Sequence, residues 1–265
     1  MADPMPTVTS PSGDEIPDLG QGGDRGRAPG LDLGMNLIDT AEMYADGAAE
    51  KLVAEAIDGR RDEVFLVSKV MPHHATREGT VQACQDSMQR LKTDRIDLYL
   101  LHWRGYVPLA DVADTDELIS LPGGREVATD QVLYNLSRRA PELALFPLCD
   151  ELGMPVMAYS PIGQGRILGN RVVRDIALRH NVSAAQIALA WVLWLDGICA
   201  TPRAGNPEHV YEDRALDIRL DKSDPRYWTR SPRRHCITGR WRCSSGRVRL
   251  AASLRSPILS QNGRG

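Results

Sequence analysis

Three apolar segments in the first half of the chain each end on an ionisable side chain. NLID ends at Asp39, VFLVSK at Lys69 and DLYLLH at His102. Their apolar residues are nearly continuous rather than alternating, which is typical of parallel strands buried on both faces. Segments with helical periodicity separate them, so the pattern predicts consecutive strand–helix units and a parallel α/β sheet.

The alternation of predicted strands and helices continues as far as residue 221. Residues 1–35 are rich in Gly, Pro and Asp, and they predict a hairpin followed by one short strand around residues 18–22. A Ser-x-x-Gln capping box, from Ser183 to Gln186, marks the start of the strongest helix. The expected strands are 36–41, 64–70, 96–102, 128–134, 155–160 and 198–202, and the expected helices are 47–57, 80–91, 142–152, 183–195 and 208–215.

Charge divides the chain into two parts. Residues 222–265 contain ten Arg, one Lys and one acid, for a net charge of +10, so residues 1–221 carry −13 of the total of −3. We therefore predict a folded α/β domain over residues 1–221 and an Arg-rich tail over residues 222–265 that is disordered. A reading-frame change in a GC-rich gene would produce such a shift. The alternative is an arm for nucleic acid, which an aperiodic basic segment favours less.

Two further features limit the class of protein. No apolar run approaches the roughly 18 residues that span a bilayer, and residues 1–15 lack the basic and apolar regions of a secretory signal. The five cysteines are scattered and lack CxxC spacing, which favours a reducing cytoplasm over a disulfide framework or a zinc site. We expect a cytoplasmic protein without a membrane span or a metal ion.

The residues at the predicted strand ends form a coherent chemical set with Tyr44, which follows Asp39 in the next loop. Carboxyl ends of strands in a parallel barrel open onto one face. A tyrosine phenol, whose ordinary pKa in water is about 10, becomes a better acid beside the ammonium of Lys69. Asp39 would hold that lysine, and His102 would orient a carbonyl. Each residue alone is more often structural, but together they predict protonation of a carbonyl oxygen while hydride reaches its carbon.

Six segments carry a resemblance to a known family. Residues 34–221, with a weaker echo in PDLGQG at 17–22, resemble the aldo-keto reductase superfamily, most of all its bacterial members. The resemblance implies a (β/α)8 TIM barrel that reduces aldehydes or ketones to alcohols with NADPH, NADH being possible. The segments are GMNLIDTAEMYADGAAEKLVAEAI, VFLVSKV, QRLKTDRIDLYLLHW, DQVLYNL, VMAYSPIGQGRIL and QIALAWVL.

The resemblance also implies roles for individual residues. Tyr44 is the general acid, Asp39 and Lys69 tune it, and His102 orients the carbonyl. Trp103 lines the substrate pocket, although a packing role is equally expected. The implied cofactor residues are Gln131 at the nicotinamide carboxamide, Tyr159 stacked on the nicotinamide ring, Ser160, Pro161, Gly163 and Gly165 along the pyrophosphate, Arg203 at the adenosine 2′-phosphate, and Asn206.

The chain departs from the family pattern in ways that predict an incomplete barrel. Too few residues separate Gly22 from Leu31 for a first helix, and one βα unit of about thirty residues around the fifth strand is absent. That unit carries a Ser-Asn pair that helps to hold the nicotinamide. Tyr211 and Asp213 replace a common Arg and Asn at the adenosine end. A catalytically impaired NADP(H)-binding or regulatory barrel is therefore the alternative function, and both the substrate and the oligomeric state stay open.

Overall fold

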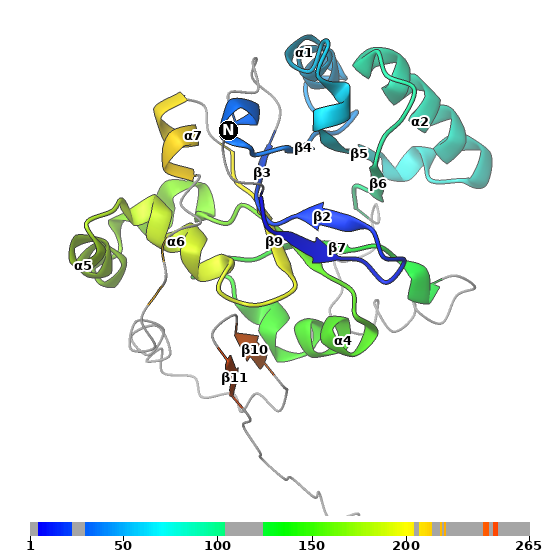
Figure 1. Ribbon diagram of the computed structural model, residues 1–265. Helices are drawn as coiled ribbons and strands as arrows, with labels where there is room; N and C mark the ends of the chain where they lie inside the picture. The colour runs from blue at the N-terminus through cyan, green and yellow to red at the C-terminus, as the bar shows by residue number, and fades with distance from the viewer. Residues whose placement is uncertain are drawn as a thin grey trace, which may run out of the picture.

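The computed structural model contains parallel strands in two hydrogen-bonded groups (Figure 1). It describes residues 5–22, 30–103, 124–203, 207–213, 218, 220, 241–243 and 246–248. In the first group the order is β3-β4-β5-β6, and in the second it is β7-β8-β9. The strands are β3 (Gly20–Gly22), β4 (Leu37–Asp39), β5 (Phe65–Val70), β6 (Leu98–Leu101), β7 (Asp130–Leu133), β8 (Val156–Tyr159) and β9 (Ile198–Thr201).

The two groups meet where β3 lies beside β9. Leu19 and Ala200 form a parallel bridge, and the Ala200 N–H donates to the Asp18 carbonyl over 2.7 Å. Farther along, the Gly22 N–H donates to the Pro202 carbonyl over 2.9 Å. The seven parallel strands therefore follow one another in the curved order β6-β5-β4-β3-β9-β8-β7, as in an α/β barrel.

The other seam of the barrel lies between β6 and β7. Within the described residues no strand pairing joins these two strands, and residues 104–123, which connect them in sequence, lie outside the described part. The predicted loss of a βα unit around the fifth strand falls at this seam. The predicted loss of the first helix falls between β3 and β4, where the described residues contain only the short 3-10 helix η1 (Leu31–Leu33).

A hairpin of β1 (Thr7–Thr9) and β2 (Glu15–Pro17) closes the amino-terminal end of the strands, and this confirms the hairpin expected near the start of the chain. Its Val8 and Ile16 are buried in one cluster with Leu37, Val67 and Met157, which lie on three different barrel strands. Apolar side chains thus fill the lower interior, and the carboxyl-terminal end is left for polar residues.

Helices cover the outside of the strands (Figure 1). Their caps set several boundaries: Thr76 accepts from the Gly79 N–H over 3.0 Å, so α2 begins three residues before the predicted Thr80. The capping box of Ser183 and Gln186 is confirmed. The α-helices are α1 (Ala48–Ala56), α2 (Arg77–Leu91), α4 (Leu145–Leu152), α5 (Arg171–His180), α6 (Ala184–Val192) and α7 (Pro207–Asp213), and the other 3-10 helices are η2 (Arg61–Glu63), η3 (Pro72–His74), η4 (Gly124–Glu126), η5 (Ala140–Leu143) and η6 (Gly163–Gly169).

Within the Arg-rich tail the structure describes residues 241–243 and 246–248. Strands β10 (Trp241–Cys243) and β11 (Gly246–Val248) pair antiparallel. Trp241 and Val248 are residue types that favour strands, and the Ser-Ser pair before Gly246 favours a turn, so this sequence favours a hairpin even without a longer period. Within the described residues, no helix has both the length and the apolar character needed to cross a membrane.

Asp18, just before β3, gives a first prediction on stability. Burial and the nearby charge of Asp196 raise the pKa of Asp18 to about 6. A carboxyl group whose pKa is higher in the folded than in the unfolded protein destabilises the fold at pH values where it is ionised. This destabilisation disappears at lower pH, where the carboxyl is protonated in both the folded and the unfolded protein. We expect Asp18→Asn to raise the free energy of unfolding by about 1–2 kcal/mol at pH 8.

The effect of Asp18→Asn should fade between about pH 6 and pH 4, as the wild-type carboxyl takes up its proton. Chemical denaturation at several pH values measures it, and Asp58→Asn is the control because Asp58 is exposed on the surface. A gain in stability that is the same at pH 4 and pH 8 would contradict this account of Asp18.

Candidate active site

A buried ion pair lies at the carboxyl ends of β4 and β5. The Lys69 Nζ is 2.5 Å from the Asp39 Oδ1 and donates to the Thr40 carbonyl over 2.8 Å. Lys69 is 1% exposed and Asp39 5% exposed. A buried lysine is stable as a cation only with such partners, so the two strand ends hold one ammonium group at a defined point.

Tyr44 and His102 complete the cluster at this end of the barrel. The Tyr44 Oη lies 3.4 Å from the Lys69 Nζ, and the ammonium is 5.0 Å from the centre of the phenol ring. The His102 ring meets the Tyr44 ring edge-on at 5.4 Å between centroids. Trp103 in turn meets the His102 ring at 4.8 Å. The structure thus brings together all four residues expected to be catalytic, with Trp103 beside them.

His102 is neutral in this setting. Burial is the main reason that the pKa of His102 is lowered to about 4, and the positive charge of Lys69 contributes to the same decrease. Its Nδ1 atom is buried and has no hydrogen-bond partner among the described residues. A neutral imidazole carries one N–H donor, which can point at an oxygen atom without adding charge to the site.

Glu42 is a site residue that the sequence patterns did not single out. Its Oε1 accepts from the Met71 N–H over 2.6 Å and lies 3.1 Å from the His74 Nδ1. These contacts tie the loop that carries Tyr44 to the end of β5. The only sequence signal is the position of Glu42 in TAEMY, between two residues of the cluster.

A second buried carboxylate holds α1 and α2 against β5 behind the cluster. The Glu50 side chain is fully buried, accepts from the Ser68 hydroxyl over 2.6 Å and lies 2.5 Å from the Arg90 Nε. Ser68 precedes Lys69 in β5 and points outward, so this network fixes the strand from outside while Lys69 points inward.

Strands β7 and β8 face the cluster from the other side of the barrel. Gln131 in β7 donates from its Nε2 to the Asp39 Oδ2 over 3.2 Å. Tyr159 ends β8 and is 38% exposed. Burial and the nearby Tyr44 raise the pKa of Tyr159 above its usual value. Two residues expected at the nicotinamide therefore lie beside the residues expected to be catalytic.

The loop after β8 has an unusual backbone. Ser160, Gly163, Gln164 and Gly165 all have positive φ angles, of 51°, 58°, 56° and 82°. The Gly163 N–H donates to the Ser160 carbonyl over 2.9 Å and the Gly165 N–H to the Ile162 carbonyl over 3.0 Å, so the loop consists of two successive tight turns. The Pro161 side chain is buried beneath the same loop.

Asn135, at the end of β7, supports that loop and was also not expected from the sequence. Its Nδ2 donates to the Ser160 carbonyl over 3.0 Å, and its Oδ1 accepts from the Ser137 N–H over 2.9 Å. Arg203 follows β9 next to Gly22 of β3, with an exposed side chain. Asn206 lies outside the described residues.

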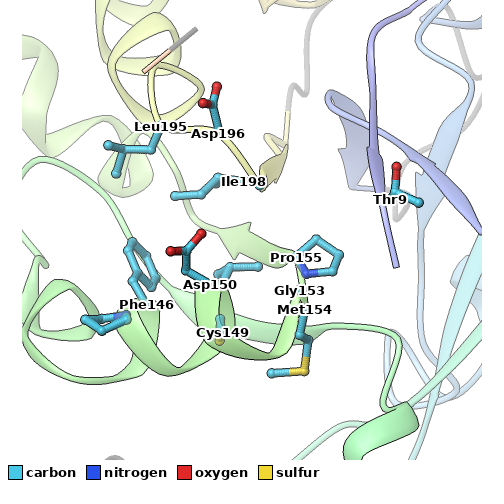
Figure 2. Close-up of a pocket in the computed structure, with 13 residues that line it drawn as sticks. Thr9, Phe146, Cys149, Asp150, Gly153, Met154, Pro155, Leu195, Asp196 and Ile198 are labelled. Carbon is cyan, nitrogen blue, oxygen red and sulfur yellow. The ribbon is translucent and has the colours of Figure 1, made fainter. Parts of the chain in front are cut away.

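A separate pocket of about 310 Å³ lies at the opposite end of the strands (Figure 2). The turns before β8 and β9 form it, with Asp150 and Asp196 among mostly apolar residues such as Phe146 and Ile198. None of the residues of the cluster lines it. The chemistry therefore belongs to the carboxyl-terminal end, where active sites of parallel barrels form.

Comparison with known proteins agrees with this geometry. The Aldo/keto reductase family matches residues 29–115 and 110–231, which together make up most of the chain. Methylglyoxal reductase YeaE from Escherichia coli is 46% identical over 224 residues, an alignment that covers 74% of this chain and 79% of YeaE. The chain belongs to the aldo/keto reductase family. It is thus a member of a family of oxidoreductases, as the resemblance implied.

Solved structures of aldo/keto reductases share the fold. One from Klebsiella pneumoniae, in complex with NADP and acetate, superposes with a TM-score of 0.80 at 35% identity and covers 89% of this chain and 99% of its own. Another from the same organism, in complex with NADPH, gives a TM-score of 0.77 at 37% identity, with 85% and 94% covered. The expected α/β barrel of the aldo/keto reductase type is confirmed.

The alignments also agree with the predicted internal deletion. The YeaE alignment spans 224 residues, whereas 74% of the 265 residues of this chain is about 196, so about 28 aligned positions have no residue in this chain. The two segments of the family match meet at residues 110–115, inside the β6–β7 connection. One βα unit of a barrel with roughly 250 residues has this length.

Proposed function

We propose that this aldo/keto reductase reduces a small aldehyde or ketone to the alcohol, with NADPH as the hydride donor and Tyr44 as the proton donor. The observation that carries the proposal is the position of the Lys69 ammonium, held by Asp39 and 3.4 Å from the Tyr44 hydroxyl. A cytoplasmic location remains an expectation from the sequence.

The chain's own residues would handle the proton. Tyr44 would donate its phenolic proton to the carbonyl oxygen of the substrate and become a phenolate. Lys69 would stabilise that phenolate, because a nearby cation favours the charged form of an acid. Asp39 would keep Lys69 in place and charged, and the buried setting would strengthen both interactions.

Neutral His102 would donate its N–H to the same carbonyl oxygen. Because the pKa of His102 is about 4, we expect kcat to stay constant from about pH 7 down to about pH 5. Steady-state rates at saturating substrate check this. His102→Gln is the matched control, since an amide offers an N–H but cannot ionise in this range. An acid limb near pH 6 that the glutamine variant abolishes would contradict the assignment.

The residues present fit NADPH, which would supply the hydride. The loop from Ser160 to Gly165, which includes Pro161 and Gly163, would run along the pyrophosphate, because its two glycines carry no side chain that would keep a ligand from the backbone. Gln131 contacts Asp39 and Tyr159 lies near Tyr44, so both could contact a nicotinamide bound beside the proton donor. The charge of Arg203 supports NADPH over NADH, whereas Tyr211 and Asp213 offer no second cation at the adenosine end.

Two relatives suggest the class of substrate. YeaE is named a methylglyoxal reductase, and a protein from Bacillus subtilis that is 27% identical over 212 residues is named a glyoxal reductase. We take small dicarbonyl compounds as the first substrates to test. The aromatic rings of His102 and Trp103 near Tyr44 suit a small carbonyl compound.

Asn135 allows a test of the cofactor loop. We expect Asn135→Ala to weaken NADPH binding by about tenfold, because the Ser160 carbonyl loses one of its two donors, keeps only the Gly163 N–H, and the turn is held less firmly. Fluorescence titration with NADPH measures the change. Ser137→Ala is the control, since Ser137 contributes only its backbone N–H to Asn135. Equal affinities for the two variants would show that Asn135 does not shape the cofactor site.

The second candidate function is a barrel that binds NADP(H) without turnover. The β6–β7 seam, which has no pairing among the described residues, favours it, because the predicted missing unit would carry part of the nicotinamide site. Parallel measurements of NADPH binding by fluorescence and of NADPH oxidation with methylglyoxal distinguish the two. Binding with turnover supports the reductase, whereas tight binding without turnover of several small aldehydes supports the second function.

A further inference from the structure

Gln131 reaches across the barrel interior to the carboxylate of the ion pair. Its Nε2 donates to the Asp39 Oδ2 over 3.2 Å, whereas Lys69 takes the other oxygen, Oδ1. Gln131 belongs to β7 and Asp39 to β4, so the contact joins two strands that are far apart in the barrel order. The same Nε2 lies 3.0 Å from the Met157 sulfur in β8.

We propose that Gln131 is a positioning residue for the proton donor, acting through Asp39 and Lys69; this inference rests on the proposed function. Asp39 is 5% exposed, and each oxygen of a buried carboxylate needs a donor. Lys69 satisfies one oxygen and Gln131 the other. With both donors in place the carboxylate cannot rotate freely, and the ammonium that it holds stays 3.4 Å from the Tyr44 hydroxyl.

The contact leaves the other end of the amide for the cofactor. Because the Nε2 of Gln131 is committed to Asp39, its Oε1 is the atom that can accept from a ligand N–H. The carboxamide of nicotinamide offers such a donor. One glutamine can therefore serve the proton-donating half of the site and the cofactor half at the same time, so its loss should affect the rate of turnover as well as binding.

A double-mutant cycle between Gln131 and Asp39 tests the inference. Gln131→Met keeps the length of the side chain but removes the donor, and Asp39→Asn removes the charge that Gln131 supports. At saturating NADPH we expect Gln131→Met to lower kcat by about tenfold in the wild-type background and by less than twofold in the Asp39→Asn background. A residue that serves only the cofactor would have equal effects in both backgrounds, and that result would overturn the inference.

Thermal unfolding of the cofactor-free protein provides a readout that does not depend on activity. The midpoint should fall by several degrees for Gln131→Met, and by clearly less when Asp39 is already Asn. If the decreases in midpoint caused by the two single substitutions simply add in the double variant, the contact between Gln131 and Asp39 is overturned. If the midpoints are not additive but Gln131→Met lowers kcat equally in both backgrounds, the positioning role is overturned. If the wild-type chain shows no turnover with any small aldehyde, the proposed function fails, and the thermal cycle still decides the contact.

Gln82→Met is the matched control, and it needs no change at Asp39. Gln82 donates to Asp86 over 2.8 Å on the exposed face of α2, so the same substitution there should leave kcat unchanged. Gln131→Met should lower kcat at saturating NADPH even if the Asp39→Asn protein does not fold. A Gln131→Met variant that changes only KM for NADPH would also overturn the inference.

Discussion

Tyr44→Phe should lower kcat by about 10²- to 10⁴-fold, the usual contribution of a general acid, and leave the affinity for NADPH nearly unchanged. The substitution removes only the hydroxyl that lies 3.4 Å from the Lys69 ammonium, and the ring keeps its packing against His102. Stopped-flow and steady-state measurements of NADPH oxidation with methylglyoxal check the rate. Fluorescence titration checks the binding.

Tyr99→Phe is the matched control for this variant. Tyr99 also lies on a barrel strand, and burial raises its pKa to about 12, but it pairs with the outward-pointing Ser68 and faces the helix layer. Loss of its hydroxyl should leave kcat within about twofold. Equal rate losses in the two variants would mean that Tyr44 acts through folding rather than as the acid.

Lys69→Met should have the second large effect, on both stability and turnover. It removes the cation that faces Asp39 at 2.5 Å and leaves a buried carboxylate unpaired, which costs about 3–5 kcal/mol. It also removes the charge that would stabilise the Tyr44 phenolate, so turnover should be lost. Chemical denaturation and NADPH oxidation measure the two effects separately.

The double variant Lys69→Met with Asp39→Asn distinguishes charge from packing. Removing both charges should restore most of the lost stability, because no unpaired ion remains in the interior. Turnover should not return. A Lys69→Met variant as stable as the wild type would contradict the account of a buried ion pair. Turnover by the double variant would contradict the role of Lys69.

The strand ends could be predicted from the sequence because they depend on local pattern. Apolar runs that close on Asp39, Lys69 and His102 predict buried parallel strands, and parallel topology places their ends at one face. Tyr44 follows Asp39 closely in the sequence, so it is expected in the loop after that strand. The capping box at Ser183 was predictable for the same reason, since both partners lie within one helical turn.

Other parts of the site depend on contacts between distant segments. The contact of Gln131 with Asp39 joins residues 92 positions apart, and no local period indicates it. Asn135 fixes Ser160 only after β7 and β8 have paired. Helix α5 is different, because Asn170 caps it and Val173, Ile176 and Ala177 give it a buried face. It was not among the expected helices, although both of these signals are local in the sequence.

Transfer of deuterium tests most directly the claim that this chain is a working reductase. The whole chain would be incubated with methylglyoxal and NADPH that carries deuterium at both hydrogen positions of the nicotinamide C4. We expect the alcohol product to contain deuterium on the former carbonyl carbon, and the Tyr44→Phe protein to yield almost none in the same time. Bound NADPH that never passes its deuterium to methylglyoxal or to another small aldehyde would contradict the claim.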